Sequence, residues 1–331
     1  MVRKIDWDNQ IGHRLRLRDL QIFMAVARHG SMNKAARELR LSQPAVSGII
    51  TALEHAIGEQ LLDRNNQGVE PTRYGHALLE RSIVVFDELR QGIRDIEHLA
   101  DPTFGEVRIG CVDSIASTML PRVIETFAER YPQVVFHVDR VTTTDADLMK
   151  LRGRGLDLVL IRYFPPFAPD NDDLAIETLF EDYLVAVCGR RSRFASQSRI
   201  GLEDLAQERW ILTPDTANRF ILTDAFRRAG LDPPKVFLVS FSVELRTRLV
   251  ATGRYIAAFA RSVVQPETER KLKILPIAFP PRQWPIVLVT LKRRTLNPIA
   301  QHFIDHLRGC MKTLPTELGL RQPTESVRSK R

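Results

Sequence analysis

The spacing of apolar residues changes within residues 101–105, and this change constrains the fold of the 331-residue chain more than any other feature. From Leu17 to about Leu99, apolar side chains recur every three or four residues, which predicts amphipathic helices. Beyond Glu106, short apolar runs alternate with helix-like segments, which is typical of α/β folds. The Asp-Pro-Thr-Phe-Gly run between them breaks the helix. We therefore expect an α + α/β chain with a hinge between its two parts.

Three short helices and a small hairpin are expected in the first part. Ser31 and Ser42 are suited to cap the second and third helices, and Pro44 suits the first turn of the third. The predicted inner face of the first helix consists of Leu20, Phe23, Met24 and Ala27. The turn-rich segment 61–71 predicts a hairpin, which we call the wing. Residues 14–72 are thus expected to form a winged helix-turn-helix domain.

The expected third helix carries a polar face that a hydrophobic core does not need. Gln43, Ser47 and Thr51 are four residues apart, and Pro44 and Gly48 lie beside them. Short, uncharged, hydrogen-bonding side chains suit insertion into the major groove of double-stranded DNA. Gln43 and Ser47 would then contact base edges, and Pro44 a thymine methyl group. The alternative is a solvated polar face on an ordinary helical domain.

Basic and hydroxyl-bearing side chains around this helix are candidates for phosphate contacts. Any single exposed arginine is about as often plain surface, and the formal net charge of +8 does not by itself establish a nucleic-acid partner. The phosphate candidates are Ser31, Lys34, Arg37, Arg64 and Arg73. The full set of candidate DNA-contacting residues is Ser31, Lys34, Arg37, Ser42, Gln43, Pro44, Ser47, Gly48, Thr51, Arg64 and Arg73.

One long helix is expected over residues 73–101, with Thr72 as its N-cap. Its apolar residues lie near heptad spacing, and they include Leu79, Ile83, Phe86, Ile93 and Ile96. A single exposed helix would leave such a stripe in water. The helix therefore either lies on the rest of the protein or pairs with its copy in a dimer.

The α/β part, residues 104–314, is expected to form two lobes. Lobe I should comprise residues 104–178 and 279–314, and lobe II residues 179–278, so that the chain crosses between the lobes twice. Clefts between lobes are favoured sites for small molecules. The basic segment 315–331 is expected to be a disordered tail.

One loop of lobe I has the pattern of a ligand-binding turn. Asp113, Ser114 and Ile115 follow a predicted strand and open a helix. Backbone N–H groups there, together with the Ser114 hydroxyl, could receive an anionic or hydroxyl-bearing ligand. Simple N-capping by Asp113 or Ser114 is an equally good interpretation.

The run from Gly30 to Leu39, followed by Leu41 to Ser47, closely resembles the N-terminal signature of LysR-type transcriptional regulators. Further matching positions are Leu53, Glu54, Gly58, Leu61, Leu62, Arg64, Thr72 and Gly75. The sequence departs from the pattern at Gly48 and Ile49, where family members usually carry Arg or Lys and then a polar residue. A phosphate or base contact of the family is therefore in doubt at Gly48.

The resemblance implies a winged helix-turn-helix, a linker helix that dimerises, and a two-lobed effector domain similar to type 2 periplasmic binding proteins. It also implies a homotetramer built as a dimer of dimers, with RNA polymerase as a further partner. The implied effector contacts are Asp113, Ser114, Ile115, Thr143, Thr144, Arg162 and Thr213. Arg162 follows an apolar strand end and would either face a carboxylate-like ligand or pair with an acidic neighbour. We therefore expect a small organic acid as the effector.

Motifs of other functional classes are missing from the sequence. It has no Walker A loop, no G-x-S-x-G and no H-E-x-x-H, so we expect no enzyme, no cofactor and no metal site. Its three cysteines are far apart, although the arginines after Cys188 leave modest thiol reactivity open. With no membrane-length apolar stretch and a polar N-terminus, a cytoplasmic, nucleoid-associated protein is expected.

Two alternatives to an effector-controlled regulator remain open. One is a two-lobed solute-binding protein or enzyme with an incidental N-terminal helical extension. The other is an architectural DNA-binding protein that has no effector.

Overall fold

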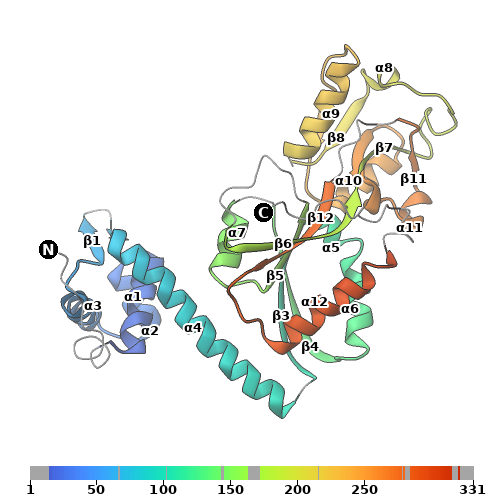
Figure 1. The fold of residues 1–331 in the computed structure, drawn as a ribbon. Coiled ribbons are helices and arrows are strands. Elements are labelled where there is room, and N and C mark those ends of the chain that lie inside the picture. The colour runs from blue at the N-terminus through green and yellow to red at the C-terminus, as the bar shows by residue number, and fades with distance from the viewer. Residues whose placement is uncertain are drawn as a thin grey trace. The chain divides into compact units, whose positions relative to one another are not determined.

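The computed structural model describes residues 15–65, 68–101, 103–142, 145–162, 172–214, 216–277, 279, 284–314 and 320. The chain divides into two compact units, Met1–Ile93 and Arg94–Arg331 (Figure 1). The elements of the first unit are α1 (Leu17–His29), α2 (Met32–Leu39), α3 (Gln43–Ile57), β1 (Leu62–Asn65), β2 (Gly68–Pro71) and α4 (Arg73–Ala100), which continues into the second.

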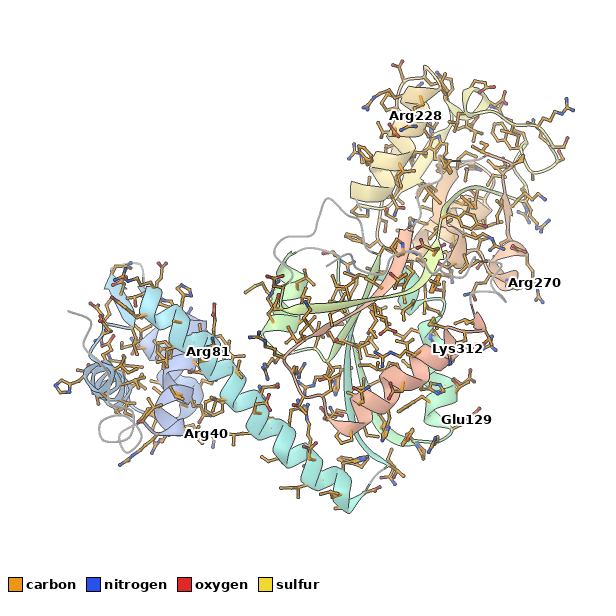
Figure 2. The ribbon with its side chains drawn as sticks, viewed as in Figure 1. Arg40, Arg81, Glu129, Arg228, Arg270 and Lys312 are labelled. Atoms are coloured by element: carbon orange, nitrogen blue, oxygen red, sulfur yellow. The ribbon has the colours of Figure 1, made fainter. Side chains whose placement is uncertain are left out.

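The helix ends of the first unit follow the predicted caps. The Ser31 hydroxyl accepts a hydrogen bond from the Lys34 backbone N–H (3.4 Å), and the Ser42 hydroxyl accepts one from Ala45 (3.3 Å). Arg40, labelled in Figure 2, ends α2 in the left-handed conformation with φ of 54°. Strands β1 and β2 pair antiparallel and form the predicted wing. The winged helix-turn-helix is confirmed.

The inner face of α1 is wider than predicted. Leu20 and Phe23 are buried as expected, but Met24 and Ala27 are only half-buried. The additional buried residues are Ile22, Ala25 and Val26. Helices α2 and α3 and strand β2 all pack against α1, so this helix is enclosed from several sides and does not follow the pattern of a single buried stripe.

Helix α4 begins tightly against the wing and then exposes an apolar stripe. The Thr72 hydroxyl accepts a hydrogen bond from the Gly75 N–H (3.1 Å), which confirms the predicted cap. A Cβ atom at Gly75 would lie 2.0 Å from the Leu61 carbonyl oxygen, so only glycine fits there. Of the predicted stripe, Ile93 and Ile96 are exposed, and Leu79, Ile83 and Phe86 are half-buried. Further exposed apolar residues of α4 are Val85, Leu89 and Leu99.

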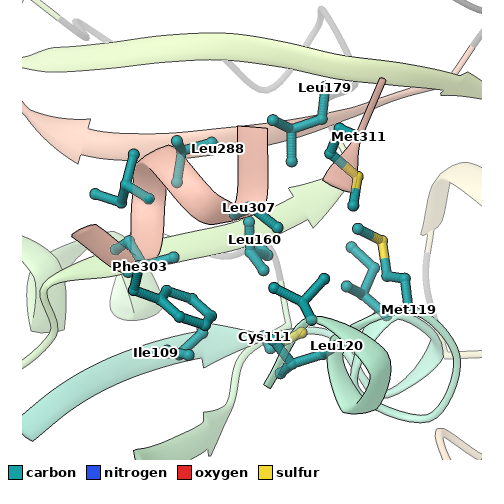
Figure 3. Close-up of a cluster of buried hydrophobic side chains, with 14 of the residues drawn as sticks. Ile109, Cys111, Met119, Leu120, Leu160, Leu179, Leu288, Phe303, Leu307 and Met311 are labelled. Carbon is teal, nitrogen blue, oxygen red and sulfur yellow. The ribbon is translucent and has the colours of Figure 1, made fainter. Parts of the chain in front are cut away.

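Lobe I of the second unit is a layered α/β structure. Its five-stranded sheet has the order β4-β3-β5-β12-β6, with β12 antiparallel to both neighbours and β3 parallel to both of its own. The elements are β3 (Phe104–Cys111), α5 (Asp113–Ala116), α6 (Leu120–Ala128), β4 (Gln133–Arg140), α7 (Asp145–Arg152), β5 (Leu158–Arg162), β6 (Leu174–Asp182), β12 (Trp284–Leu291) and α12 (Pro298–Cys310). Figure 3 shows Phe303 and Leu307 of α12 packed over Ile109 of β3 and Leu160 of β5, and α7 covers the other face.

Lobe II has a second five-stranded sheet in the order β11-β7-β10-β8-β9. Its elements are β7 (Leu184–Gly189), α8 (Leu202–Leu205), β8 (Arg209–Leu212), α9 (Thr216–Arg228), β9 (Lys235–Val239), α10 (Val243–Ala251), β10 (Ile256–Ala260), the 3-10 turn η3 (Arg261–Val263), α11 (Pro266–Glu269) and β11 (Leu272–Ile274). Phe226 of α9 packs on one face of the sheet, and Val250 of α10 packs on the other. The predicted α + α/β class is confirmed.

The chain crosses between the two lobes twice. Strand β6 pairs with β12 as far as Asp182, and β7 of lobe II begins at Leu184. The boundary expected between residues 178 and 179 therefore falls inside β6. All of β6 belongs to the sheet of lobe I because its residues pair with β12 as far as Asp182. The second crossing lies between β11 and β12.

Among the described residues, no helix is long and apolar enough to span a membrane.

Candidate nucleic-acid interface and ligand cleft

The N-terminal turns of α3 present the predicted polar face to solvent. Gln43, Pro44, Gly48 and Thr51 are exposed, and Ser47 is half-buried. A Cβ atom at Gly48 would meet no heavy atom within 4 Å, so the surface beside this glycine is open. The Ser42 hydroxyl, which was expected to contact DNA, is used as the helix cap. The five neighbouring positions on the face leave room for a duplex to approach.

The wing is held on α3 by Glu54. Its Oε1 atom accepts hydrogen bonds from the backbone N–H groups of Leu61 (2.9 Å) and Leu62 (3.1 Å). Arg64 of β1 lies 3.8 Å from the other carboxylate oxygen and donates to the Ser47 hydroxyl (3.3 Å). Two residues expected to contact DNA, Ser47 and Arg64, are therefore brought together. Glu54 was not expected to have this role, since its partners are seven and eight residues away.

Three of the remaining predicted phosphate contacts lie on exposed surface, and the fourth, Ser31, is half-buried. Lys34 and Arg37 project from α2, and Arg73 lies at the start of α4. The Arg73 guanidinium lies over the Tyr74 ring, 4.6 Å from its centroid, and donates to its hydroxyl. Of these cations, only Arg73 is oriented by an aromatic neighbour.

An unpredicted charged cluster lies on α1 and α2. Glu38 accepts hydrogen bonds from His29 and from Arg28, and the bond from His29 is the main cause that lowers the pKa of this exposed carboxyl group. The cluster links the helix before the turn to the helix after it.

A cleft of about 600 Å³, including its open mouth, lies between the two lobes of the second unit. Its lining residues are Val112, Asp113, Ser114, Arg140, Val141, Thr142, Arg162, Thr213, Asn218, Phe241, Arg246, Ala258, Ala260 and Val263. Four predicted effector contacts, Asp113, Ser114, Arg162 and Thr213, meet there. Ile115 is directed into the hydrophobic core of lobe I, and Thr143 and Thr144 lie outside the described residues.

Arg162 pairs with an acidic neighbour, which is the second of the two predicted alternatives. It donates to Asp182 Oδ2 (3.1 Å) and to the Ser114 hydroxyl. Asp182 is fully buried and also accepts from the Tyr183 N–H (2.9 Å), the Ser262 N–H (3.2 Å) and the Ser262 hydroxyl (2.7 Å). Its carboxylate therefore joins a strand end of lobe I to η3 of lobe II and neutralises the Arg162 charge.

Asp113 bridges the lobes at the start of α10. Its Oδ2 atom accepts a hydrogen bond from the Val243 backbone N–H (2.8 Å), the first residue of α10. The Ser242 hydroxyl caps the same turn by accepting from Leu245 (3.2 Å). A carboxylate at a helix N-terminus is favourable because unpaired N–H groups and the helix dipole both attract anions.

Sequence reasoning missed Arg246 of α10. Only 2% of this residue is exposed, and its guanidinium lies 4.5 Å from the centroid of the Phe259 ring. Burial lowers the pKa of Arg246 to about 10; the Asp113 carboxylate opposes that shift and Arg162 adds to it. The side chain is therefore a cation at neutral pH. Its signal in the sequence is an arginine three residues after Val243 and four before Val250, at the spacing of one helix face.

Two more unpredicted residues flank the cleft. Arg140 at the end of β4 is exposed and lies 4.3 Å from the centroid of the Phe241 ring. Asn218 of α9 donates to the Thr213 hydroxyl (2.9 Å) and thereby orients a predicted contact.

None of the three thiols is among the residues that line the cleft. Cys188 is fully buried, and burial raises its pKa, which argues against the reactivity left open by its arginine neighbours. Cys111 is also buried with a raised pKa, and Cys310 is half-buried. Among the described residues, no cluster of three metal-ligating side chains is found.

Comparisons with known proteins agree with this architecture. Residues 17–76 match the model of the bacterial regulatory helix-turn-helix protein, lysR family, and residues 100–311 match the LysR substrate binding domain. The HTH-type transcriptional regulator GbpR of Azospirillum brasilense is 28% identical over 320 residues, which cover 95% of this chain and 92% of that protein. The transcriptional dual regulator GltC of Bacillus subtilis is 28% identical over 292 residues, which cover 88% and 96%.

Solved structures show the same fold. A crystal structure of CbnR, a LysR family transcriptional regulator, has a TM-score of 0.56 at 23% identity and covers 89% of this chain and 99% of that chain. Full-length CbnR is also known in complex with its target DNA, with a TM-score of 0.50 at 23% identity, covering 90% and 100%. Because the substrate-binding model alone matches more than half of the sequence, the chain belongs to the LysR family, as a DNA-binding transcriptional regulator with an effector-binding domain.

Proposed function

We propose that the exposed face of α3 reads base edges in the major groove and that the wing and α2 contact the phosphates. The observation that carries the proposal is the open polar surface of Gln43, Gly48 and Thr51 on a helix that Glu54 fixes to the wing. Gln43 and Ser47 would read bases, with Pro44 against a thymine methyl group. Ser31, Lys34, Arg37, Arg64 and Arg73 would contact the backbone of the duplex.

The test replaces Gln43 with alanine. An operator is first recovered by selection from a pool of random duplexes, and the affinities of wild type and variant for operator and random DNA are then compared. We expect Gln43→Ala to lower operator affinity about tenfold, or ~1.4 kcal/mol, and to leave random DNA almost unaffected. Gln21→Ala, at an exposed position of α1, is the control. Equal losses on both duplexes would remove the base-reading role.

We further propose that α4 pairs with its copy through the exposed stripe formed by Val85, Leu89, Ile93, Ile96 and Leu99. Heptad-like apolar residues in a long helix are stabilised when a second helix covers them. Two such dimers would make the tetramer implied by the family resemblance, with RNA polymerase as a partner at promoters on nucleoid DNA. Light scattering should report a smaller species for Ile93→Glu and no change for Glu97→Gln, since Glu97 is also exposed on α4. An unchanged mass for Ile93→Glu would contradict the pairing.

The cleft is the proposed effector site of the domain 104–314. The contacts of Asp113 and Asp182 across the lobes mean that a ligand bound there acts on both lobes at once. An effector changes DNA binding only if it prefers one of two arrangements of the lobes. Titrating the full chain with DNA in the presence and absence of a bound ligand measures that preference.

A further inference from the structure

Arg246 is a buried cation without a hydrogen-bonding partner among the described residues. Its Nε and Nη1 atoms are inaccessible to solvent and unbonded, and the guanidinium forms no ion pair within the described part of the chain. The guanidinium lies over the face of the Phe259 ring. Burying a charge with unmet donors is costly unless an anion compensates it.

Two other arginines of the second unit, whose side chains are little exposed, show how this fold satisfies a structural guanidinium. Arg294 lies 3.2 Å from Asp157 and donates to the carbonyl oxygens of Leu156 and Arg154. Arg162 pairs with Asp182. The Nε atom of Arg162 is also unbonded, but the charge of Arg162 is paired, whereas Arg246 has no ion pair among the described residues and lies at the wall of the cleft. Unmet donors of a cation at such a wall are suited to an anionic ligand.

The Asp113 carboxylate lies where a bound anion would be attracted. It comes from lobe I, bonds the first N–H of α10 in lobe II, and its charge favours the protonated form of Arg246. The carboxylate does not hydrogen-bond the guanidinium, so the attraction is only partly satisfied. A second cation, Arg140, lies at the cleft with no ion pair in the described residues. The charge of the cleft is therefore positive beyond what Asp113 neutralises.

We propose that the cleft binds a small organic carboxylate that pairs with Arg246 and displaces Asp113 from the start of α10. The ligand class rests on the proposed effector role of the cleft. Ala258, Ala260 and Val263 line the same cleft with apolar surface, so the ligand has an apolar part as well as its carboxylate. Displacing Asp113 breaks a bond between the lobes, and ligand binding is thereby coupled to their arrangement.

The first experiment needs no knowledge of the natural ligand. The full chain is screened by thermal shift with 10 mM acetate, succinate, 2-oxoglutarate and benzoate, and with acetamide, succinamide and benzamide as uncharged counterparts. We expect at least one carboxylate to raise the melting temperature and its amide to have no effect. No response to any of the carboxylates, or an equal response to acid and amide, would overturn the proposal.

Substitutions then test the residues by calorimetry with the carboxylate that gives the largest shift. Arg246→Gln should weaken binding at least tenfold, whereas Arg248→Gln, on the same helix but exposed, should change it less than twofold. Asp113→Asn retains an oxygen that accepts the Val243 N–H but removes the competing charge. It should therefore tighten binding several-fold, whereas a residue that only supports the cleft would weaken binding when replaced. Unchanged affinity in Arg246→Gln, or weaker binding in Asp113→Asn, would overturn the assignment.

A ligand-free measurement separates a ligand-binding role of Arg246 from a structural one. Methionine has similar length and no unmet donors, so Arg246→Met should melt at the same temperature as wild type or higher. A melting temperature several degrees lower would show a structural role. Binding of the same preparations to random duplex DNA separates the proposal that Arg246 binds a carboxylate from the proposal that the cleft is an effector site. DNA binding without any carboxylate response overturns this inference alone, and carboxylate binding that never alters DNA affinity overturns the effector role alone.

Discussion

Replacing Gly48 with arginine should strengthen DNA binding and stabilise the helix-turn-helix unit at the same time. Position 48 is exposed and nothing lies within 4 Å of a Cβ atom there, so the side chain leaves the helix into open space. Arginine is favoured over an interior helical glycine by about 0.7 kcal/mol. For a unit of this size, that difference raises the melting temperature by about 3–5 °C.

The effect on DNA follows from counterion release. One additional phosphate contact steepens the slope of log affinity against log salt concentration by about 0.9, which corresponds to about an eightfold gain at 0.1 M salt. The assay is fluorescence anisotropy with a random-sequence duplex over a series of NaCl concentrations, because a phosphate contact does not depend on the operator. Gly309→Arg adds the same charge at an exposed helical glycine of α12 with equally open space, and it should leave the slope unchanged.

The melting temperature and the salt dependence of DNA affinity together separate a folding effect of Gly48→Arg from an effect on DNA binding. A variant with the raised melting temperature is folded, so its DNA affinity can be interpreted directly. If Gly48→Arg has the raised melting temperature but the wild-type affinity and salt slope, the face of α3 beside Gly48 does not approach DNA. The proposed recognition surface would then be wrong.

Three further outcomes follow from contacts in the two units. Glu54→Ala leaves two buried backbone N–H groups of the wing without an acceptor, so we expect a loss of about 3 kcal/mol in urea unfolding. Glu54→Gln should lose less, and an unchanged midpoint for the alanine variant would refute the role. Iodoacetamide should label the half-buried Cys310 before the fully buried Cys188, whose raised pKa also slows the reaction; equal labelling by intact mass would contradict the burial. Asp173 accepts two hydrogen bonds from Arg152 (2.8 and 3.0 Å), which lower its pKa below 3.8. Their contribution is complete above pH 3.8 and is lost as the pH falls through the lower folded-state pKa. Because both side chains are partly exposed, Asp173→Asn should remove less than about 1 kcal/mol of acid sensitivity in a denaturation series, and an identical pH profile would contradict this.

Interactions within a few residues made much of the fold predictable. Ser31 and Ser42 cap the helices that follow them because each hydroxyl reaches an N–H three residues away. The exposed face of α3 was also predictable, since helical periodicity separates Val46 and Ile50 from Gln43. Periodicity failed for α1, where several elements pack around one helix.

The cleft was predictable in position but not in its electrostatics. Asp113, Ser114, Arg162 and Thr213 meet as expected, because strand ends and helix starts gather at the same edges of the two sheets. The sequence did not decide whether Arg162 faces a bound ligand or pairs with an acidic side chain of the protein, since Asp182 is twenty residues away.

By itself, the sequence determined the helix caps, the exposed polar face of α3 and the division into helical and α/β parts, because these depend on neighbours along the chain. Only the tertiary structure decided which charges are neutralised. Asp113 reaches Val243 across 130 residues, and Arg162 takes the buried carboxylate of Asp182. Arg246 is thereby left as the buried cation that an incoming carboxylate would neutralise, since a pairing of charges over such separations depends on how the two lobes pack together.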